Sequence, residues 1–101
     1  MNKYGAKSSV VDGLRFDSLR ERARWNDLKK LEREKLISGL TFKPEYLLIV
    51  NKIKVCKMIP DFQYIRNGKK VIEDAKGFRT PTYKLKKKLF EALGYGEIIE
   101  V

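Results

Sequence analysis

The chain contains no histidine and only one cysteine, and both shortages limit the chemistry available to it. Without imidazole side chains, Ser-His and Cys-His nucleophilic catalysis, histidine-metal nuclease sites and zinc sites that need imidazole are excluded. Cys56 has no second cysteine in the sequence with which to form a disulfide, and its place in an apolar-alternating run predicts a packing role. Any catalysis must therefore depend on carboxylates and lysines.

The sequence also lacks long hydrophobic runs and is poor in negative charge. Its longest apolar run, residues 47–50, is far shorter than the ~20 residues of a membrane-spanning helix, so we expect a cytoplasmic protein without a membrane partner. The 23 Lys and Arg exceed the 13 Asp and Glu, which gives a formal net charge of 23 − 13 = +10. Such a charge attracts polyanions, so nucleic acid is the first partner to consider, although a merely soluble basic protein has the same excess.

The sequence patterns predict one domain of the α/β class. Residues 1–12 are polar and basic without sustained periodicity, so we predict a flexible arm that carries Lys3 and Lys7, followed by a folded domain over residues 13–101. The elements expected in this domain are a helix over residues 18–38 closed by Gly39, strands at 46–50, 53–65 and 69–76, a helix from Pro81 closed by Gly94, and a strand at 97–101. Their order is αβββαβ, with a mixed sheet flanked by helices.

Both predicted helices have one apolar side. The residues expected there are Trp25, Leu28 and Leu31 in the first helix, and Leu85, Leu89, Ala92 and Leu93 in the second. Lys84, Lys87 and Lys88 lie opposite, on a face that either is solvated or contacts phosphate. The full set of candidate DNA-binding residues is Lys3, Lys7, Arg20, Arg24, Lys84, Lys87 and Lys88.

The dipeptide Asn67-Gly68 is the strongest local signal in the sequence. It is preferred in two-residue type I′ hairpin turns because both residues tolerate a positive φ. A turn there fixes a register in which Asp61 faces Asp74. Side chains alternate along a strand, so Asp61, Asp74 and Lys76 should share one face of the sheet while Glu73 lies on the other.

Two carboxylates that face each other across a strand pair repel, so a cation is expected between Asp61 and Asp74. Mg²⁺ suits this place because it takes one or two carboxylates and keeps sites for water and a substrate phosphate. Lys76 lies near enough to orient a metal-bound water or to balance charge in the transition state. The alternative is that both acids are surface residues at strand ends and that Lys76 pairs with one of them.

Glu21 is a third candidate ligand with two interpretations. Ser18 and Glu21 have the spacing of a capping box, in which the Glu side chain bonds back to the Ser N–H. Glu21 also lies on the side of the helix that carries Trp25 and Leu28, where an inward-pointing acid needs a partner. The sequence supports both roles.

Four blocks of the chain together resemble the PD-(D/E)XK nuclease superfamily, and in particular its small phage-encoded members of unknown function. These blocks are Phe16 to Glu21, Pro60 to Tyr64, Glu73 to Phe78 and Tyr83 to Phe90. The superfamily core is αβββαβ, with an acid on the first helix, and its small relatives include Holliday junction resolvases, very short patch repair nucleases and transposon-end nucleases.

The resemblance implies a restriction-endonuclease-like core and a magnesium-dependent active site, with Mn²⁺ as a substitute ion. Asp61 and Asp74 would ligate the metal, the carbonyl of Ala75 would add a ligand, Lys76 would assist the attacking water, and Glu21 would complete the site. Asp74 stands where many relatives carry Glu, a difference that bears on metal distance and preference.

The sequence thus predicts a Mg²⁺-dependent DNA endonuclease. No zinc finger or additional helix-turn-helix is apparent, so substrate choice would depend on DNA shape, which favours a branched DNA such as a Holliday junction cut by a homodimer. The rival is a noncatalytic nucleic-acid-binding protein that retains the fold and uses its basic helix.

Overall fold

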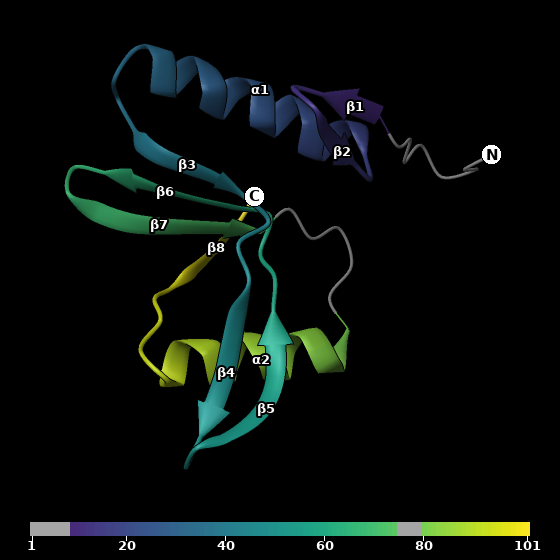
Figure 1. Cartoon of the computed structure of the whole chain (residues 1–101), viewed down its shortest axis with the longest axis vertical. Coiled ribbons are helices and arrows are strands. Elements are labelled where there is room, and N and C mark those ends of the chain that lie inside the picture. Colours follow the sequence, from purple (N-terminus) through teal and green to yellow (C-terminus); the bar gives the residue numbers. More distant parts are fainter. Residues whose placement is uncertain (1–8, 75–79) are drawn as a thin grey trace.

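The computed structural model describes residues 9–74 and 80–101, which form two helices and eight strands (Figure 1). In chain order these are β1 Ser9–Val11, β2 Leu14–Phe16, α1 Leu19–Arg33, β3 Ser38–Phe42, β4 Tyr46–Val50, β5 Ile53–Met58, β6 Phe62–Arg66, β7 Lys69–Asp74, α2 Pro81–Ala92 and β8 Ile98–Glu100. Helices and strands mix along the chain, which confirms the predicted α/β class. The expected order αβββαβ omitted β1, β2 and β3 and joined β5 to β6.

The central sheet has four strands in the order β3-β6-β7-β8, and β8 runs parallel to β7. The β6–β7 hairpin has the predicted register, with Phe62 paired to Glu73 and Arg66 paired to Lys69. Asn67 and Gly68 have φ values of 52° and 74°, which are the positive values that a type I′ turn requires. The turn prediction is confirmed, and with it the alternation of side chains along β7.

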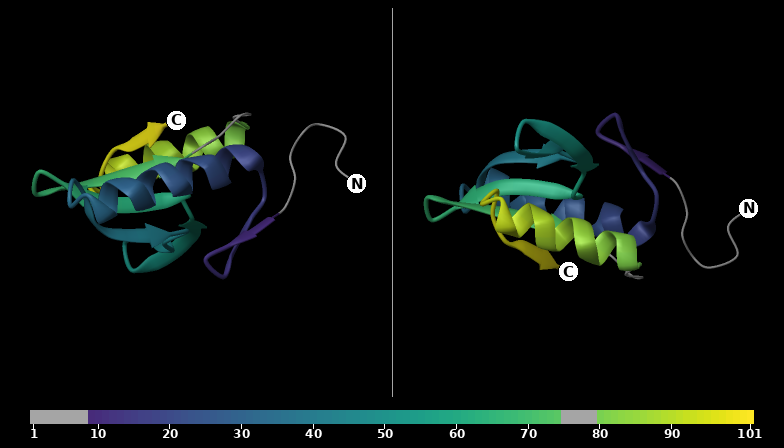
Figure 2. Two further views of the ribbon diagram at one scale, coloured as in Figure 1. Left: turned by 90° about the horizontal axis from the view of Figure 1, so that it is seen from above. Right: turned by 90° about the horizontal axis from the view of Figure 1, so that it is seen from below.

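The two helices lie on opposite sides of this sheet (Figure 2). On one side, α1 contributes Trp25 and Leu28 to a core with Phe62 and Tyr64. On the other side, Ile72 of β7 packs in a second core, whose members are Leu48, Met58, Tyr83, Phe90 and Ile98. The hairpin of β4 and β5 belongs to this second core and extends away from the sheet beside α2 (Figure 1).

Helix α1 ends earlier than the sequence predicted. Lys35 takes the left-handed conformation at the C-terminal end, with φ 63°, and the N–H groups of Lys35 and Leu36 donate to the carbonyls of Glu32 and Leu31. This is a Schellman motif in which a lysine occupies the position usually given to glycine. Gly39, which we expected to close the helix, instead lies in β3 at an irregularity in its pairing with β6.

The predicted strand over residues 53–65 is two strands. Pro60 has no N–H to donate, and the chain leaves the β4–β5 hairpin at this point to enter the central sheet. The passage is fixed by two backbone bonds of Asp61, whose N–H donates to Glu73 at 3.1 Å and whose carbonyl accepts from Lys43 at 2.8 Å. Two sheets therefore meet at Asp61.

The predicted arm over residues 1–12 is corrected at residues 9–12. Residues 9–11 form β1, which pairs with β2 around a turn at Asp12 and Gly13. The indole N–H of Trp25 donates to the Asp12 carboxylate at 3.0 Å, which ties this hairpin to α1. Lys3 and Lys7 lie outside the described residues.

Helix α2 begins and ends as predicted, but its buried face differs. The side chain of Thr80 caps the first turn, Pro81 follows it, and Gly94 takes a positive φ after the last turn. Tyr83 and Phe90 are buried, and Leu89 and Leu93 are partly buried against the same core as predicted, whereas Leu85 is 69% exposed and Ala92 is exposed. The two aromatic rings, seven residues apart, set the rotation of the helix because they bury more area than the leucines.

Candidate active site

Two buried carboxylates lie where the two sheets meet. Asp74 is the last residue of β7 and is 1% exposed, and Asp61, just before β6, is 6% exposed. The ladder between β6 and β7 is paired as far as Phe62 and Glu73, and the Asp61 N–H then donates to the Glu73 carbonyl. The backbone thus brings Asp61 to the end of β7 beside Asp74, one step beyond the last paired residues.

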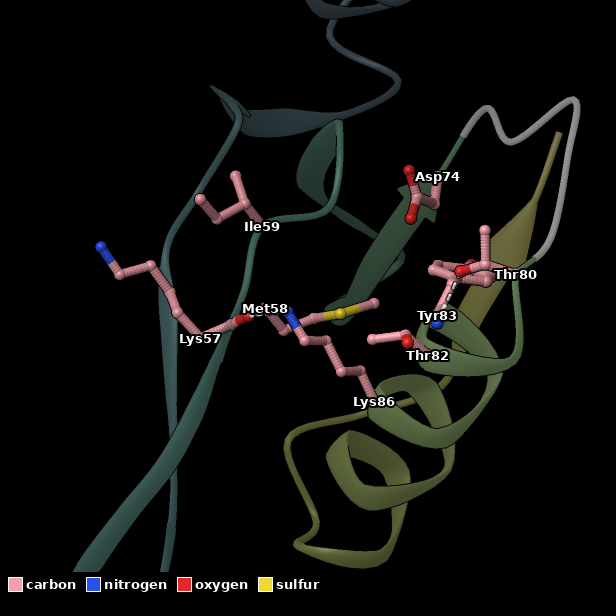
Figure 3. Close-up of a pocket in the computed structure, with 8 residues that line it drawn as sticks. All are labelled: Lys57, Met58, Ile59, Asp74, Thr80, Thr82, Tyr83 and Lys86. Carbon is pink, nitrogen blue, oxygen red and sulfur yellow. Dashed lines mark hydrogen bonds between the residues drawn. The ribbon is translucent and has the colours of Figure 1, made fainter.

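Asp74 lines a cavity of about 360 Å³ between the end of β5 and the first turns of α2 (Figure 3). Met58 and Ile59 form one wall, and Thr80, Thr82, Tyr83 and Lys86 form the other. We call this cavity the Asp74 cleft. Lys57 borders it through its backbone, but the Lys57 side chain extends away and pairs with Glu45 at 2.9 Å.

Tyr83 and Glu100 surround Asp74 on the α2 side. In the parallel pairing of β7 with β8, Glu100 is the partner of Asp74. Burial raises the pKa of Tyr83 above its usual value, and the negative charges of Asp74 and Glu100 and hydrogen bonds to them raise it further. Tyr83 therefore stays protonated, and its hydroxyl lies close to these two carboxylates.

Sequence reasoning missed Glu100. We predicted a strand at its position, but no pattern in the sequence showed which strand it would pair with. A parallel partner is joined by a long crossover, here through α2, and leaves no hairpin signal in the sequence. The parallel pairing of β7 with β8 thus places Glu100 beside Asp74, although the two acids lie far apart in the sequence.

Glu21 lies in the first turn of α1, where Ser18 accepts a hydrogen bond from the Glu21 N–H at 3.1 Å. The predicted N-terminal cap at Ser18 is thus confirmed. This turn reaches the end of the sheet that carries Asp74, because Arg20 donates to the Val101 carbonyl at 2.5 Å and the Val101 N–H donates to the Asp74 carbonyl at 3.1 Å. The role of Glu21 as a ligand stays a prediction.

The oxygen donors at this place are of the kind that Mg²⁺ prefers. Asp74 and Asp61 are buried carboxylates, and Glu100 is the residue opposite Asp74 in the pairing of β7 with β8. In residues 9–74 and 80–101, no three His, Cys, Asp or Glu residues are grouped so that they alone could hold a metal ion. Ala75 and Lys76, which the sequence assigned to the same site, lie outside the described residues.

Glu73 has a different environment from its neighbour Asp74. Its carboxylate is 1% exposed and faces α1, where Arg24 donates to both oxygens at 2.7 and 2.6 Å and the Tyr64 hydroxyl donates to one of them. The hydrogen bonds and charge of Glu73 raise the pKa of Arg24. Burial, followed by the hydrogen bond to Glu73, raises the pKa of Tyr64 to about 12. The prediction that Glu73 points away from Asp74 is confirmed.

The basic residues that we expected to contact DNA fall into two groups. Arg24, Arg20 and Lys87 have protein partners, which are the Glu73 carboxylate, the Val101 carbonyl and, at 3.5 Å, the Glu100 carboxylate. Lys84 and Lys88 are exposed on α2. Arg24 in particular is committed to Glu73 by two hydrogen bonds, which favours a structural role over phosphate binding.

The chain belongs to the DUF1064 family, described as proteins of unknown function, whose model matches residues 1–99. No curated protein and no solved structure matches the sequence. In the part of the chain that the structure describes, neither helix is long and apolar enough to cross a membrane.

Proposed function

We propose that this member of the DUF1064 family is a metal-dependent DNA endonuclease that uses Mg²⁺, or Mn²⁺ in its place. The observation that carries the proposal is the Asp74 cleft, where a carboxylate at the end of a central strand is almost fully buried and lines the same open cavity as the cationic side chain of Lys86. A basic protein with a net charge of +10 attracts the polyanionic substrate that such a cleft would act on.

The chain's own residues supply the ligands and the orientation of the site. Asp74 and Asp61 are the residues that would hold the metal, with Glu21 and the Ala75 carbonyl as the further ligands expected from the resemblance to PD-(D/E)XK nucleases. When bound, Mg²⁺ polarises a phosphate oxygen and lowers the pKa of a coordinated water. Tyr83, which lies close to Asp74 and Glu100, would donate a hydrogen bond toward these carboxylates and so help to orient them. Lys76 is the residue proposed to orient the attacking water.

The substrate proposed is branched DNA, cut by a homodimer in the cytoplasm, which for a phage protein is that of the host. A two-fold dimer supplies the two symmetric nicks that resolving a junction needs. Two predicted edge strands support the dimer, since β8 is at the edge of the central sheet and β4 pairs with β5 alone among the described strands. Sedimentation with and without a four-way junction tests this part, and a monomer that nicks linear and branched DNA equally would contradict it.

The nuclease itself is tested by incubating the protein with linear and branched DNA in Mg²⁺, in Mn²⁺ and in EDTA. We expect cleavage only with a metal ion, and we expect Asp74→Asn and Lys76→Ala to abolish it while DNA affinity is retained. Asp27→Asn is the matched control because Asp27 is an exposed aspartate on α1. Binding by the wild-type protein without any metal-dependent cut would favour the rival function, a noncatalytic nucleic-acid-binding protein.

A further inference from the structure

The lysines of α2 lie in different surroundings although they are close in sequence. Lys84 and Lys88 are exposed, and Lys87 is paired with Glu100. Lys86 instead extends along the wall of the Asp74 cleft, and its ammonium group donates to the Lys57 carbonyl of β5 at 3.3 Å. Sequence periodicity placed three of these lysines on a basic face and gave Lys86 no role.

The ammonium group of Lys86 has hydrogen-bonding capacity left for a ligand. A lysine ammonium has three N–H donors. One of them is used by the Lys57 carbonyl, and this is its one protein hydrogen bond within residues 9–74 and 80–101. Figure 3 shows the side chain directed from α2 toward the cavity that also contains Asp74.

The rest of the cleft suits an anionic group with several oxygens. Thr82 and Thr80 place hydroxyl groups on the same wall as Lys86, while Met58 and Ile59 make the opposite wall apolar. An apolar wall lowers the local dielectric and strengthens the attraction between an ammonium group and an anion. A cavity of about 360 Å³ is large enough for a phosphodiester and its sugar.

Asp74 and Lys86 therefore present opposite charges to one cavity. We propose that Lys86 is the phosphate-binding residue of the Asp74 cleft and that its ammonium group binds a nonbridging oxygen of the phosphodiester held beside Asp74. This assignment rests on the proposed function, and it makes Lys86 a contact to the reacting group while Lys84 and Lys88 contact distant phosphates.

The test uses Lys86→Met, which removes the charge and keeps the length of the side chain, with Lys84→Met and Lys88→Met as matched controls from the same helix. Binding of a fluorescent DNA substrate is measured in EDTA, and kcat/KM is measured in Mg²⁺. Loss of a charge-assisted hydrogen bond should weaken DNA binding and kcat/KM about 10- to 100-fold in Lys86→Met. The two controls should change binding less than about threefold, since single exposed charges contribute little, and Lys86→Arg should restore most of the loss.

Equal effects of the three methionine variants on DNA binding would overturn the assignment and leave the nuclease proposal standing. A selective loss of binding in Lys86→Met, in a protein that cuts no DNA, would support Lys86 as the phosphate contact and end the nuclease proposal. Melting temperatures separate binding from folding. If Lys86→Met is destabilised and Lys86→Arg regains stability without regaining DNA affinity, Lys86 acts only through its bond to the Lys57 carbonyl, and the assignment is wrong.

Discussion

Glu73 and Asp74 are successive acids at the end of one strand, both are 1% exposed, and they face opposite sides of the sheet. Glu73 faces α1, where Arg24 and Tyr64 occupy its oxygens. Asp74 faces the cavity between β5 and α2 that also contains Lys86. The comparison shows that burial alone does not distinguish a structural acid from a candidate catalytic one. The partners of each carboxylate, and the space beside it, make the distinction.

The largest effect is expected from removing the partner of Glu73. Arg24→Met leaves a buried carboxylate without its cation and should lower the free energy of unfolding by about 3 kcal/mol, measured by urea denaturation. Arg33→Met, at an exposed arginine of the same helix, should change it by less than about 0.5 kcal/mol. Adding Glu73→Gln to Arg24→Met should recover part of the loss. If Arg24→Met is as stable as the wild type, Glu73 and Arg24 are not a structural pair.

The second prediction concerns Tyr64, which donates to Glu73, and the pH dependence of its contribution to stability. Tyrosine in the unfolded chain ionises near pH ~10, whereas the pKa of Tyr64 in the fold is about 12. Because the pKa of Tyr64 is higher in the folded than in the unfolded chain, Tyr64 contributes to the free energy of unfolding below pH ~10. This contribution is lost as the pH rises to about 12, and the loss amounts to about 3 kcal/mol. The difference in unfolding free energy between the wild type and Tyr64→Phe should therefore shrink over this window. A difference that is constant between pH 9 and 12 would contradict the assignment.

The third prediction asks which of the two acids Glu21 resembles. Glu21→Gln keeps much of any capping hydrogen bond and removes the charge that a metal ion would attract. If Glu21 belongs to the same site as Asp74, cleavage should fall about tenfold or more while the melting temperature changes little. A lowered melting temperature with normal specific activity would assign Glu21 to capping, so that it resembles Glu73 instead.

The smallest effect concerns the basic residues outside the cleft. Neutralising Lys84, Lys87 and Lys88 together should weaken DNA binding for all sequences alike, because phosphate contacts carry little sequence information. The slope of log K against log salt should become shallower by about 0.9 for each lysine that contacts a phosphate. Lys87 is paired with Glu100, so the slope should change by about two such steps rather than three. An unchanged slope would make this a solvated face.

The parts of the site that could be predicted depend on local signals. The dipeptide Asn67-Gly68 predicts a type I′ turn without help from distant residues. The register set by this turn, together with the alternation of side chains along β7, predicted that Glu73 and Asp74 lie on opposite faces. Thr80-Pro81 defined the start of α2 in the same way. Each of these signals acts within a few residues, where backbone sterics decide the conformation.

The parts that could not be predicted depend on distant contacts. Glu100 meets Asp74 through a parallel strand pairing, and Arg24 meets Glu73 from a helix far away in sequence. The rotation of α2 follows from Tyr83 and Phe90 packing in a core that also contains residues of β4 and β5, and this rotation brings Lys86 to the cleft. Local patterns also gave a wrong end for α1, because they predicted the left-handed residue after the helix at Gly39 and the structure has it at Lys35.

The alternation along β7 has a consequence for how the gene can change. A deletion or insertion of one residue between Gly68 and Glu73 would exchange the two faces, so that the carboxylate of Asp74 met Arg24 and that of Glu73 entered the cleft. Folding and chemistry would be damaged by the same event. Substitutions at exposed positions of this strand, such as Lys69 and Lys70, leave the alternation intact. We therefore expect the length of this segment to be under stronger selection than the identity of its exposed residues.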